Sequence, residues 1–375
     1  MVNYVAPVEK FHDIKRFIMI SDTHFGVRSN SVEWMEIQQD YFMNWFIPKL
    51  REIYKPGDAL IHTGDVFDSR QTINLRVMNM AMGIFEEIAK IMPVFMLCGN
   101  HDIYYKTSND VNSIKIFKWL NNVKVYESPV VLEVNKCKTK LLLLPWQDSN
   151  EDESLYIQNN KADYLFCHTD FRGVKFNNRV DIDEGNDVSM VNGFKRVYSG
   201  HIHFAQKYHN IRMVGCPYQL TRSDSGNVKK LWSINFENGV EEGISNDYSP
   251  KFIRMSLEKV IETTYEEMKE CIRNNFVDIL VSSSWAAKFP FSTFLDLFAD
   301  IKYRKLNYII TTVGNEDEID LEGNEETEEE VYLPTLIDMY IDNLSYNTPI
   351  KQKLKDVSRK MYQKSLKDDA EETIG

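Results

Sequence analysis

The sequence predicts a layered α/β fold followed by two smaller units, and three observations lead to this prediction. Over the first 240 residues, short apolar runs alternate with segments of helical periodicity, which is typical of sheets flanked by helices. The length of 375 residues suffices for two or three domains. Residues 316–330 contain ten acidic residues and no basic residue, which indicates a solvated linker before the C-terminal segment.

Eight short apolar runs are expected to form the strands of the first domain, residues 1–248. They are residues 17–21, 59–63, 94–98, 140–144, 164–167, 197–199, 211–214 and 231–236. Helical patterns separate the early runs, as in layered α/β folds. No such pattern separates the last two runs, which therefore predict an antiparallel edge.

Residues 75–89 predict a helix with two neighbouring apolar stripes. One stripe consists of Leu75, Met78, Met82, Phe85 and Ala89. The other consists of Val77, Ala81, Ile84, Ile88 and Ile91. Such a helix is either buried on all sides, or packs on its own sheet and on a second subunit. The stripes leave both interpretations open.

Residues 249–314 are expected to form a small α+β capping domain. A helical pattern near residues 265–275 is followed by apolar runs at 277–281 and 306–312. No motif in this segment indicates chemistry.

The acidic linker, residues 315–331, leads to a predicted pair of amphipathic helices in residues 332–375. Their apolar faces include Leu336, Ile337, Tyr340, Leu354, Val357 and Met361. A helix pair has little core of its own, so it folds back on the body or docks on a partner. We favour docking.

Charge and composition exclude several classes of protein. The formal net charge is −12, and the ten linker acids leave only −2 for the rest, so a DNA partner stays open. The start of the chain lacks a signal-peptide pattern, and no apolar run is long enough to span a membrane. The five cysteines show no paired spacing, which predicts a reducing cytoplasm.

Five polar motifs follow strand candidates at their carboxyl ends. They are Asp22-Thr23-His24, Gly64-Asp65, Gly99-Asn100-His101-Asp102, His168 and Gly200-His201-Ile202-His203, and they hold five of the eight histidines. In open α/β sheets the loops at the carboxyl ends of strands converge on one site. These motifs are therefore expected to meet in one cleft.

The expected metal ligands are oxygen and nitrogen donors without any cysteine. They are Asp22, His24, Asp65, Asn100, His168, His201 and His203. This donor set suits Mn²⁺, Fe²⁺ or Zn²⁺, with Mg²⁺ also possible. Seven ligands suit two ions that share a bridging carboxylate, for which Asp65 is the natural candidate. Such a pair activates water for attack on a phosphodiester, with His101 as proton donor and Asp102 orienting it.

The order of these motifs resembles the calcineurin-like metallophosphoesterase superfamily. The strings Asp-Thr-His-Phe-Gly and Gly-Asp-Val-Phe-Asp, together with Pro145-Trp146 and residues 215–218, are similar to the SbcD-type DNA-repair nucleases. The C-terminal segment resembles the small subunit of the tailed-phage recombination endonuclease. Some relatives carry a histidine where Asp68 stands, and an ionised aspartate cannot donate a proton.

The resemblance implies a fold, a ligand assignment and an activity. The fold is a four-layer β-sandwich flanked by helices, with the capping domain and a C-terminal helical hairpin. One ion is held by Asp22, His24 and His203, the other by Asn100, His168 and His201, and Asp65 bridges them. The activity is that of a Mn²⁺-dependent DNA nuclease, an exonuclease on duplex ends and an endonuclease on single strands.

The resemblance also implies partners. The family pairs with an SbcC-type, ABC/SMC-like coiled-coil ATPase, on which the C-terminal helices would dock in the host cytoplasm. A homodimer would form through helix 75–89, chiefly Leu75, Met78, Met82 and Phe85, with residues 111–120 as second helix. DNA contacts are expected from basic residues near the motifs, each weighed against ordinary solvated charge. They are Arg28, Arg70, Arg172, Lys175, Arg179 and Arg222.

Two other functions fit the same motifs. A small-molecule or cyclic-nucleotide phosphodiesterase has the same site, but has no need of the linker and the C-terminal helices. A metal-bound scaffold subunit would more often have lost a ligand.

Overall fold

The computed structural model describes residues 4–105, 108–136, 138–177, 180–286 and 298–311, with Lys351, Gln352 and Lys355. The chain divides into two compact units, Met1–Asp317 and Glu318–Gly375. The residues predicted to bind an ATPase partner (Leu336, Ile337, Tyr340, Leu354, Val357 and Met361) lie outside the described residues. None of the helices in the described ranges is long and apolar enough to cross a membrane.

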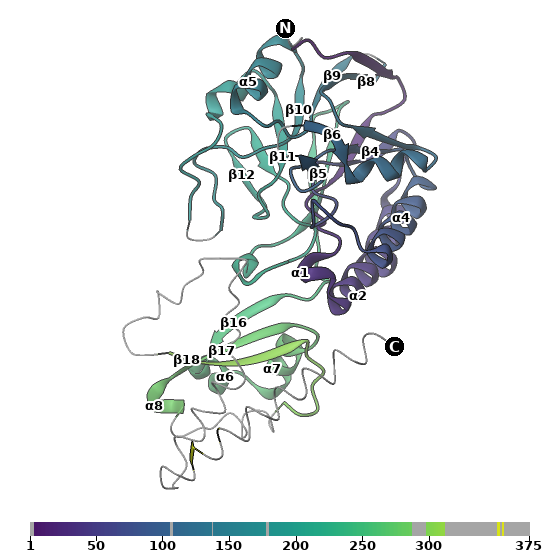
Figure 1. Cartoon of the computed structure of the whole chain (residues 1–375). Coiled ribbons are helices and arrows are strands. Elements are labelled where there is room, and N and C mark those ends of the chain that lie inside the picture. The colour runs from purple at the N-terminus through teal and green to yellow at the C-terminus, as the bar shows by residue number, and fades with distance from the viewer. Residues whose placement is uncertain are drawn as a thin grey trace. The chain divides into compact units, whose positions relative to one another are not determined.

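Two sheets form the body of the first unit (Figure 1). The seven-stranded sheet has the order β1 (Val8–Phe11), β8 (Val130–Val134), β9 (Thr139–Leu144), β10 (Tyr164–His168), β11 (Arg196–Gly200), β13 (Ile211–Met213), β12 (Gln206–Tyr208). The six-stranded sheet has the order β15 (Glu241–Ser245), β14 (Lys230–Asn235), β2 (Arg16–Ile20), β3 (Asp58–His62), β4 (Val94–Leu97), β7 (Val123–Tyr126). The strands that precede the motifs are parallel to their neighbours from β2 to β4 and from β10 to β11.

Alternate residues of these strands fill the space between the two sheets. Phe17 and Phe95 from one sheet and Leu143 and Phe166 from the other belong to one buried cluster. The intervening residues face outward and are covered by helices. For this reason the central strands are apolar at nearly every position, as expected of parallel strands buried on both faces.

Helices cover the outer faces of the two sheets. On the six-stranded sheet lie α2 (Val32–Asp40) and α4 (Leu75–Ala89). The chain continues from α2 through a π-helical turn (Tyr41–Phe46) into α3 (Ile47–Ile53). On the seven-stranded sheet lies α5 (Asn150–Asn159). The predicted layered α/β sandwich is confirmed.

The helix α4 has one buried face and one partly exposed edge. Val77, Ala81 and Ile84 pack in the core. In the stripe that begins with Leu75, Leu75 itself is 71% exposed, but Phe85 is fully buried. Phe85 therefore belongs to the core, and its prediction as a dimer contact is wrong. Met78 and Met82 are half-buried, so they and Leu75 remain the expected dimer surface on this helix.

The expected second dimer helix, residues 111–120, is a 3₁₀-helix over Ser113–Trp119. Its residues Ile114 and Phe117 are buried, whereas Trp119 is 88% exposed. Before it, β5 (Ile103–Tyr105) and β6 (Ser108–Asn112) form a separate antiparallel hairpin that the apolar pattern did not predict.

A third, three-stranded parallel sheet follows the body. It consists of β16 (Phe252–Ser256), β17 (Phe276–Ser282) and β18 (Lys305–Thr311), with α6 (Leu257–Glu262), α7 (Tyr265–Ile272) and the short α8 (Ser283–Ala286). It has its own buried cluster. Phe252 and Phe276 stack on Trp34 of α2, with ring centroids 6.3 and 5.6 Å away. The predicted boundary at residue 248 stays a prediction.

Candidate metal centre

Hydrogen bonds of backbone groups and of the motif side chains join the loops after β2, β3, β4, β10 and β11 to one another. Asp22 N–H donates to the carbonyl of Gly64 over 3.0 Å, and His24 N–H donates to the carbonyl of Asp65 over 3.2 Å. His201 N–H donates to Oδ1 of Asp22 over 2.9 Å. The five motifs that the sequence singled out therefore lie together at one edge of the sandwich.

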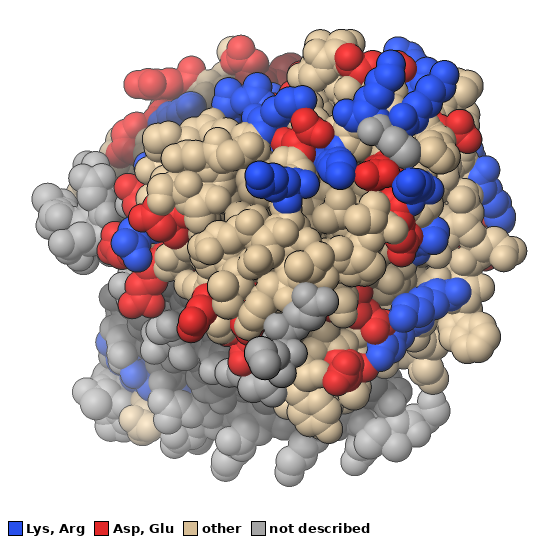
Figure 2. All heavy atoms as spheres, turned by 90° about the horizontal axis from the view of Figure 1, so that it is seen from above, with Lys and Arg blue, Asp and Glu red and all other residues tan. Residues whose placement is uncertain are grey.

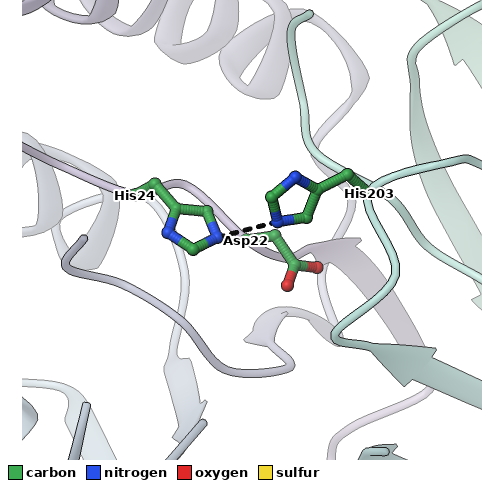
Figure 3. A group of neighbouring side chains, drawn as sticks. All are labelled: Asp22, His24 and His203. Carbon is green, nitrogen blue, oxygen red and sulfur yellow. Dashed lines mark hydrogen bonds between the residues drawn. The ribbon is translucent and has the colours of Figure 1, made fainter. Parts of the chain in front are cut away.

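Asp22, His24 and His203 form the first group of donors (Figure 3). The rings of His24 and His203 face each other, with Nε2 atoms 3.0 Å apart and the carboxylate of Asp22 beside them. All three side chains are buried or half-buried. Oδ2 of Asp22 has no hydrogen-bond partner in the described part of the chain.

Asp65, His168 and His201 form the second group, and Asn100 joins it. Oδ1 of Asn100 lies 2.9 Å from Nε2 of His168 and 2.9 Å from Nδ1 of His201. Oδ2 of Asp65 lies 3.2 Å from Nε2 of His168 and 3.8 Å from Nε2 of His24. Asp65 thus lies between the two groups. Nδ1–H of His168 donates to the carbonyl of Thr63 over 2.8 Å, which leaves its Nε2 facing the other donors.

The first group attracts a positive charge. Burial lowers the pKa of His24, but Asp68, Asp65 and Asp22 outweigh burial and raise this pKa to about 9. Burial and the neighbouring His24 lower the pKa of His203 to about 3. One positive charge is therefore favoured between two facing nitrogens, and a second is opposed.

The second group shows the same opposition. Burial lowers the pKa of His168, but Asp65 outweighs burial and raises it to about 9. Burial and the nearby His168 lower the pKa of His201 to about 3. For Asp65, burial acts to raise the pKa, yet His168 and the other histidines hold it well below its usual range.

These residues fit divalent cations. Carboxylate, amide and imidazole donors are typical ligands of Mn²⁺, Fe²⁺ and Zn²⁺ in catalytic sites. A buried carboxylate oxygen without a hydrogen bond, on Asp22, is costly unless a cation compensates it. Two groups with a carboxylate between them match the expected two-ion arrangement.

Strained backbone and close packing hold the donors in place. Asp22, His24, Asp65 and His201 have positive φ angles of 51°, 44°, 57° and 79°. Non-glycine residues adopt such angles at a cost, and they cluster at functional sites. At Gly99 an added Cβ would collide with the backbone N and Oδ1 of Asp65, which explains the glycine before Asn100.

The structure places His101 and Asp102 differently from the prediction. Nδ1–H of His101 donates to the carbonyl of Asp68 over 2.7 Å, so its Nε2 is left for the site. The carboxylate of Asp102 instead accepts N–H groups of Gly99, Asp65 and Val66 over 2.9–3.0 Å. The expectation that Asp102 orients His101 is therefore wrong. Asp102 shapes the loops around Asp65, and Asp68 holds His101.

Asp68 also contacts the first group. Its Oδ1 lies 3.3 Å from Nδ1 of His24. His24, Asp68 and His101 together form a third cluster of potential ligand atoms. A carboxylate against the second nitrogen of a metal-binding histidine fixes the orientation of the ring. Asp68, a departure from some relatives, thus serves two histidines at once.

A buried brace behind the Asp22-Thr23-His24 turn was missed by the sequence patterns. Nε2 of Gln38, on α2, donates to the carbonyls of Thr23 and His24 over 2.9 and 3.0 Å and to Oη of Tyr218 over 2.9 Å. Tyr218 O–H donates to the carbonyl of Thr23 over 2.6 Å. The only sign of it in the sequence is that Gln38 is a polar residue on the otherwise apolar face of α2.

A second brace lies behind His203. Nζ of Lys229 donates to the carbonyl of His203 over 2.8 Å and forms a buried ion pair with Asp224 over 2.5 Å. Oδ1 of Asn227 accepts the N–H of Ala205 over 3.0 Å. These contacts keep the loop after β11 in place.

Replacing Gln38 by alanine is expected to lower the free energy of unfolding by about 1–3 kcal/mol, because buried carbonyls lose their donor. Metal affinity should fall as well, since the turn that carries Asp22 and His24 is released. Denaturant unfolding and metal titration would measure both. Gln39→Ala, at the exposed next position of α2, is the control and should change stability by less than about 0.5 kcal/mol. If the two variants had the same free energy of unfolding and the same metal affinity, Gln38 would not stabilise the turn of Asp22 and His24.

A buried carboxylate joins the two ends of the loop after His168. Oε2 of Glu153, on α5, accepts the hydroxyl of Thr169 over 2.8 Å and a hydrogen bond from Nδ2 of Asn186. Burial raises the pKa of Glu153 to about 7. Both ends of the loop between Thr169 and Asn186 are therefore hydrogen-bonded to the side chain of Glu153.

The raised pKa of Glu153 makes stability depend on pH. The unfolded chain loses this proton near the usual pKa of 4.5, whereas the folded chain loses it near 7. The folded state is thus progressively destabilised as the pH rises from about 4.5 to about 7. Glu153→Gln, which cannot ionise, should gain melting temperature relative to the natural chain between pH 5 and pH 8. The exposed Glu36→Gln variant should show no such gain. If the melting temperature of Glu153→Gln relative to the natural chain also did not change between pH 5 and pH 8, the raised pKa of Glu153 would be refuted.

Two of the predicted DNA-binding residues are paired with aspartates. Nε of Arg222 is paired with Asp278 over 2.8 Å, and Lys175 is paired with Asp181 over 3.4 Å. The guanidinium of Arg28 lies over the ring of Trp34, 5.5 Å from its centroid. Arg172 is exposed and Arg70 half-buried, while Arg179 lies outside the described residues. Figure 2 shows basic and acidic side chains interspersed over the face that it draws.

Known proteins resemble this chain over most of the first unit. Residues 15–283 match the model of the calcineurin-like phosphoesterase family. Exonuclease subunit 1 of Enterobacteria phage T4 is 28% identical over 239 residues, which are 62% of this chain and 68% of that protein. A protein of Invertebrate iridescent virus 6 with a phosphoesterase name is 24% identical over 51% of this chain and 66% of its own length.

Among solved structures, a novel archaeal phosphodiesterase matches 62% of this chain and 99% of its own, with a TM-score of 0.34 and 12% identity. The matched part of this chain spans about two thirds of the length of each of the two viral relatives. The family model covers well over half of the 375 residues, and its match includes every motif that converges on the donor groups. The chain therefore belongs to the calcineurin-like phosphoesterase family.

Proposed function

We propose that this chain is a two-metal DNA nuclease that uses Mn²⁺. It acts as an exonuclease on duplex ends and as an endonuclease on single strands. The observation that carries the proposal is the convergence of two donor groups on Asp65, with the ring of His101 beside them and its Nδ1 used by the carbonyl of Asp68. The likeness to an exonuclease subunit of phage T4 supports DNA as the substrate.

The proposed ligands divide into two sets around Asp65. Asp22, His24 and His203 would hold one ion. Asn100, His168 and His201 would hold the other, and Asp65 would contact both. Bound divalent ions would polarise the phosphoryl group and lower the pKa of a water molecule towards neutrality.

His101 would serve the leaving group. Its Nδ1–H is committed to the carbonyl of Asp68, so the proton that it donates is held at Nε2. The ring of His101 packs edge-on against His24, with centroids 4.9 Å apart, so the His101 ring lies beside the first donor group. Transfer of this proton to the departing alkoxide would complete phosphodiester cleavage.

The proposed assembly is a homodimer bound to an SbcC-type coiled-coil ATPase in the host cytoplasm. The word subunit in the name of the phage T4 relative supports a multi-subunit complex. The exposed stripe of α4 supports a dimer surface, with Leu75 at its end. Co-purification with the ATPase should be lost when residues 332–375 are deleted.

The test uses metal-stripped protein and four substrates. They are linear duplex DNA, circular single-stranded DNA, a cyclic nucleotide and an aryl phosphodiester. Mn²⁺ is expected to restore cleavage of both DNA substrates, and Asp65→Asn should abolish it because the shared carboxylate charge is lost. Cleavage of only the cyclic nucleotide and the aryl ester would instead make the chain a small-molecule phosphodiesterase.

A further inference from the structure

The β5–β6 hairpin directly follows His101 and Asp102 in the chain. Its first residue, Ile103, is buried, whereas Tyr104 and Tyr105 are 48% and 54% exposed. Their rings meet edge to face, with centroids 4.9 Å apart. Neither phenol hydroxyl has a hydrogen-bond partner within the described ranges. Large exposed aromatic side chains side by side are typical of a binding surface.

The hairpin is anchored at its base to the loops of the metal centre. Ser113, directly after β6, donates its N–H to the carbonyl of Asp102 over 2.8 Å and its hydroxyl to Oδ1 of Asp102 over 3.3 Å. Asp102 in turn holds the loop of Asp65 through two backbone N–H groups. The position of the two tyrosines is therefore tied to the donor groups.

A second hydrogen bond joins the hairpin to Trp146, which contacts the metal centre. Nδ2 of Asn109, on β6, donates to the carbonyl of Trp146 over 2.9 Å. The half-buried ring of Trp146 lies against His201 and His168, with centroids 5.1 and 6.2 Å away. Trp146 thus lies next to the second donor group, and the hairpin is anchored to Trp146.

We propose that Tyr104 and Tyr105 form a stacking subsite for nucleobases of an unpaired DNA strand whose phosphate lies at the metal centre. An extended chain places Tyr104 within about 11 Å of His101. Aromatic side chains bind single strands because every base offers a ring face. A base within a duplex is already stacked on its neighbours, so this subsite favours strand ends and single strands.

The chemistry of the hairpin favours bases over other occupants. Phosphate-binding surfaces are usually rich in Lys and Arg, and the nearby Lys115 and Lys118 both lie close to Glu127, at 3.6 and 2.7 Å. Tyrosine rings offer large stacking area and need no counter-charge. This inference rests on the proposed DNA nuclease function and names the form of DNA that its site takes.

The test measures binding of a fluorescent single-stranded oligonucleotide to the full, metal-stripped chain by fluorescence anisotropy. The Tyr104→Ala/Tyr105→Ala double variant is expected to bind about tenfold more weakly than the natural chain. The Tyr104→Phe/Tyr105→Phe variant should bind like the natural chain, because the rings are kept. Tyr54→Ala, at another tyrosine that is 41% exposed, is the matched control and should have no effect.

An abasic strand of the same length separates stacking from other losses. It keeps the phosphates but has no bases, so the alanine and natural chains should bind it equally. A tenfold loss on the abasic strand too, or no loss on the normal strand, would overturn the stacking subsite. A melting curve of each variant shows whether the fold is kept. Absence of any DNA binding or cleavage by the natural chain would instead refute the proposed function itself.

Discussion

Replacing His101 by alanine is expected to lower kcat by about 10²- to 10⁴-fold on a DNA substrate with Mn²⁺. The reason is that the variant has no proton at Nε2 to give to the leaving group. The nearby His24 and His203 do not replace it, because their Nε2 atoms face each other. The metal content should stay at two equivalents. Kinetics and metal analysis of the purified variant would measure both quantities.

The metal content distinguishes a proton donor from a ligand. His101 also belongs to a cluster with His24 and Asp68, so it has the chemistry to bind an ion. Loss of one metal equivalent together with activity would make His101 a ligand, and full activity would exclude it from both roles. His12→Ala removes an exposed histidine and should leave kcat and metal content as they are.

Replacing Gly99 by alanine is expected to destabilise the fold and to disrupt the loop that carries Asp65. The added methyl group would collide with the backbone N and Oδ1 of Asp65, atoms that cannot yield without moving the shared carboxylate. The free energy of unfolding should fall by about 1–3 kcal/mol, as for an overpacked core. Metal binding should be lost at the same time. Denaturant unfolding and metal titration would show both changes.

Gly83→Ala is the matched control for this substitution. Gly83 lies on α4, and apart from the adjacent backbone of its own helix an added Cβ meets no atom within 4 Å there. Alanine is the better helix former by about 0.5–1 kcal/mol, so this variant should be slightly more stable. If Gly99→Ala were as stable as Gly83→Ala and kept its metal, the close packing around Asp65 would be wrong.

The central strands could be predicted because their apolar sequences follow directly from burial on both faces. Residues 17–20 and 94–97 are apolar throughout, since parallel strands are buried on both faces. The edge strands β7, β12 and β15 contain lysine or glutamate and look like loops. They are strands because a neighbour offers hydrogen bonds, and that neighbour is not visible in the local sequence.

Side-chain direction explains the errors at single residues. His101 and Asp102 are adjacent in the chain, and adjacency alone suggested that one orients the other. In the structure their side chains serve different loops, with Asp102 on the N–H groups around Asp65. Phe85 likewise belongs to an apolar stripe, but the packing of α4 turns it into the core.

The sequence by itself determined the type and order of the donors, because the chemistry of a carboxylate, an amide or an imidazole is local to its residue. Only the tertiary structure decided which donors share Asp65, that Asp68 holds His24 and His101, and that Gln38 braces the first turn. These relations depend on strand register and on loops from two sheets, so residues far apart in the chain meet through packing that no local pattern encodes.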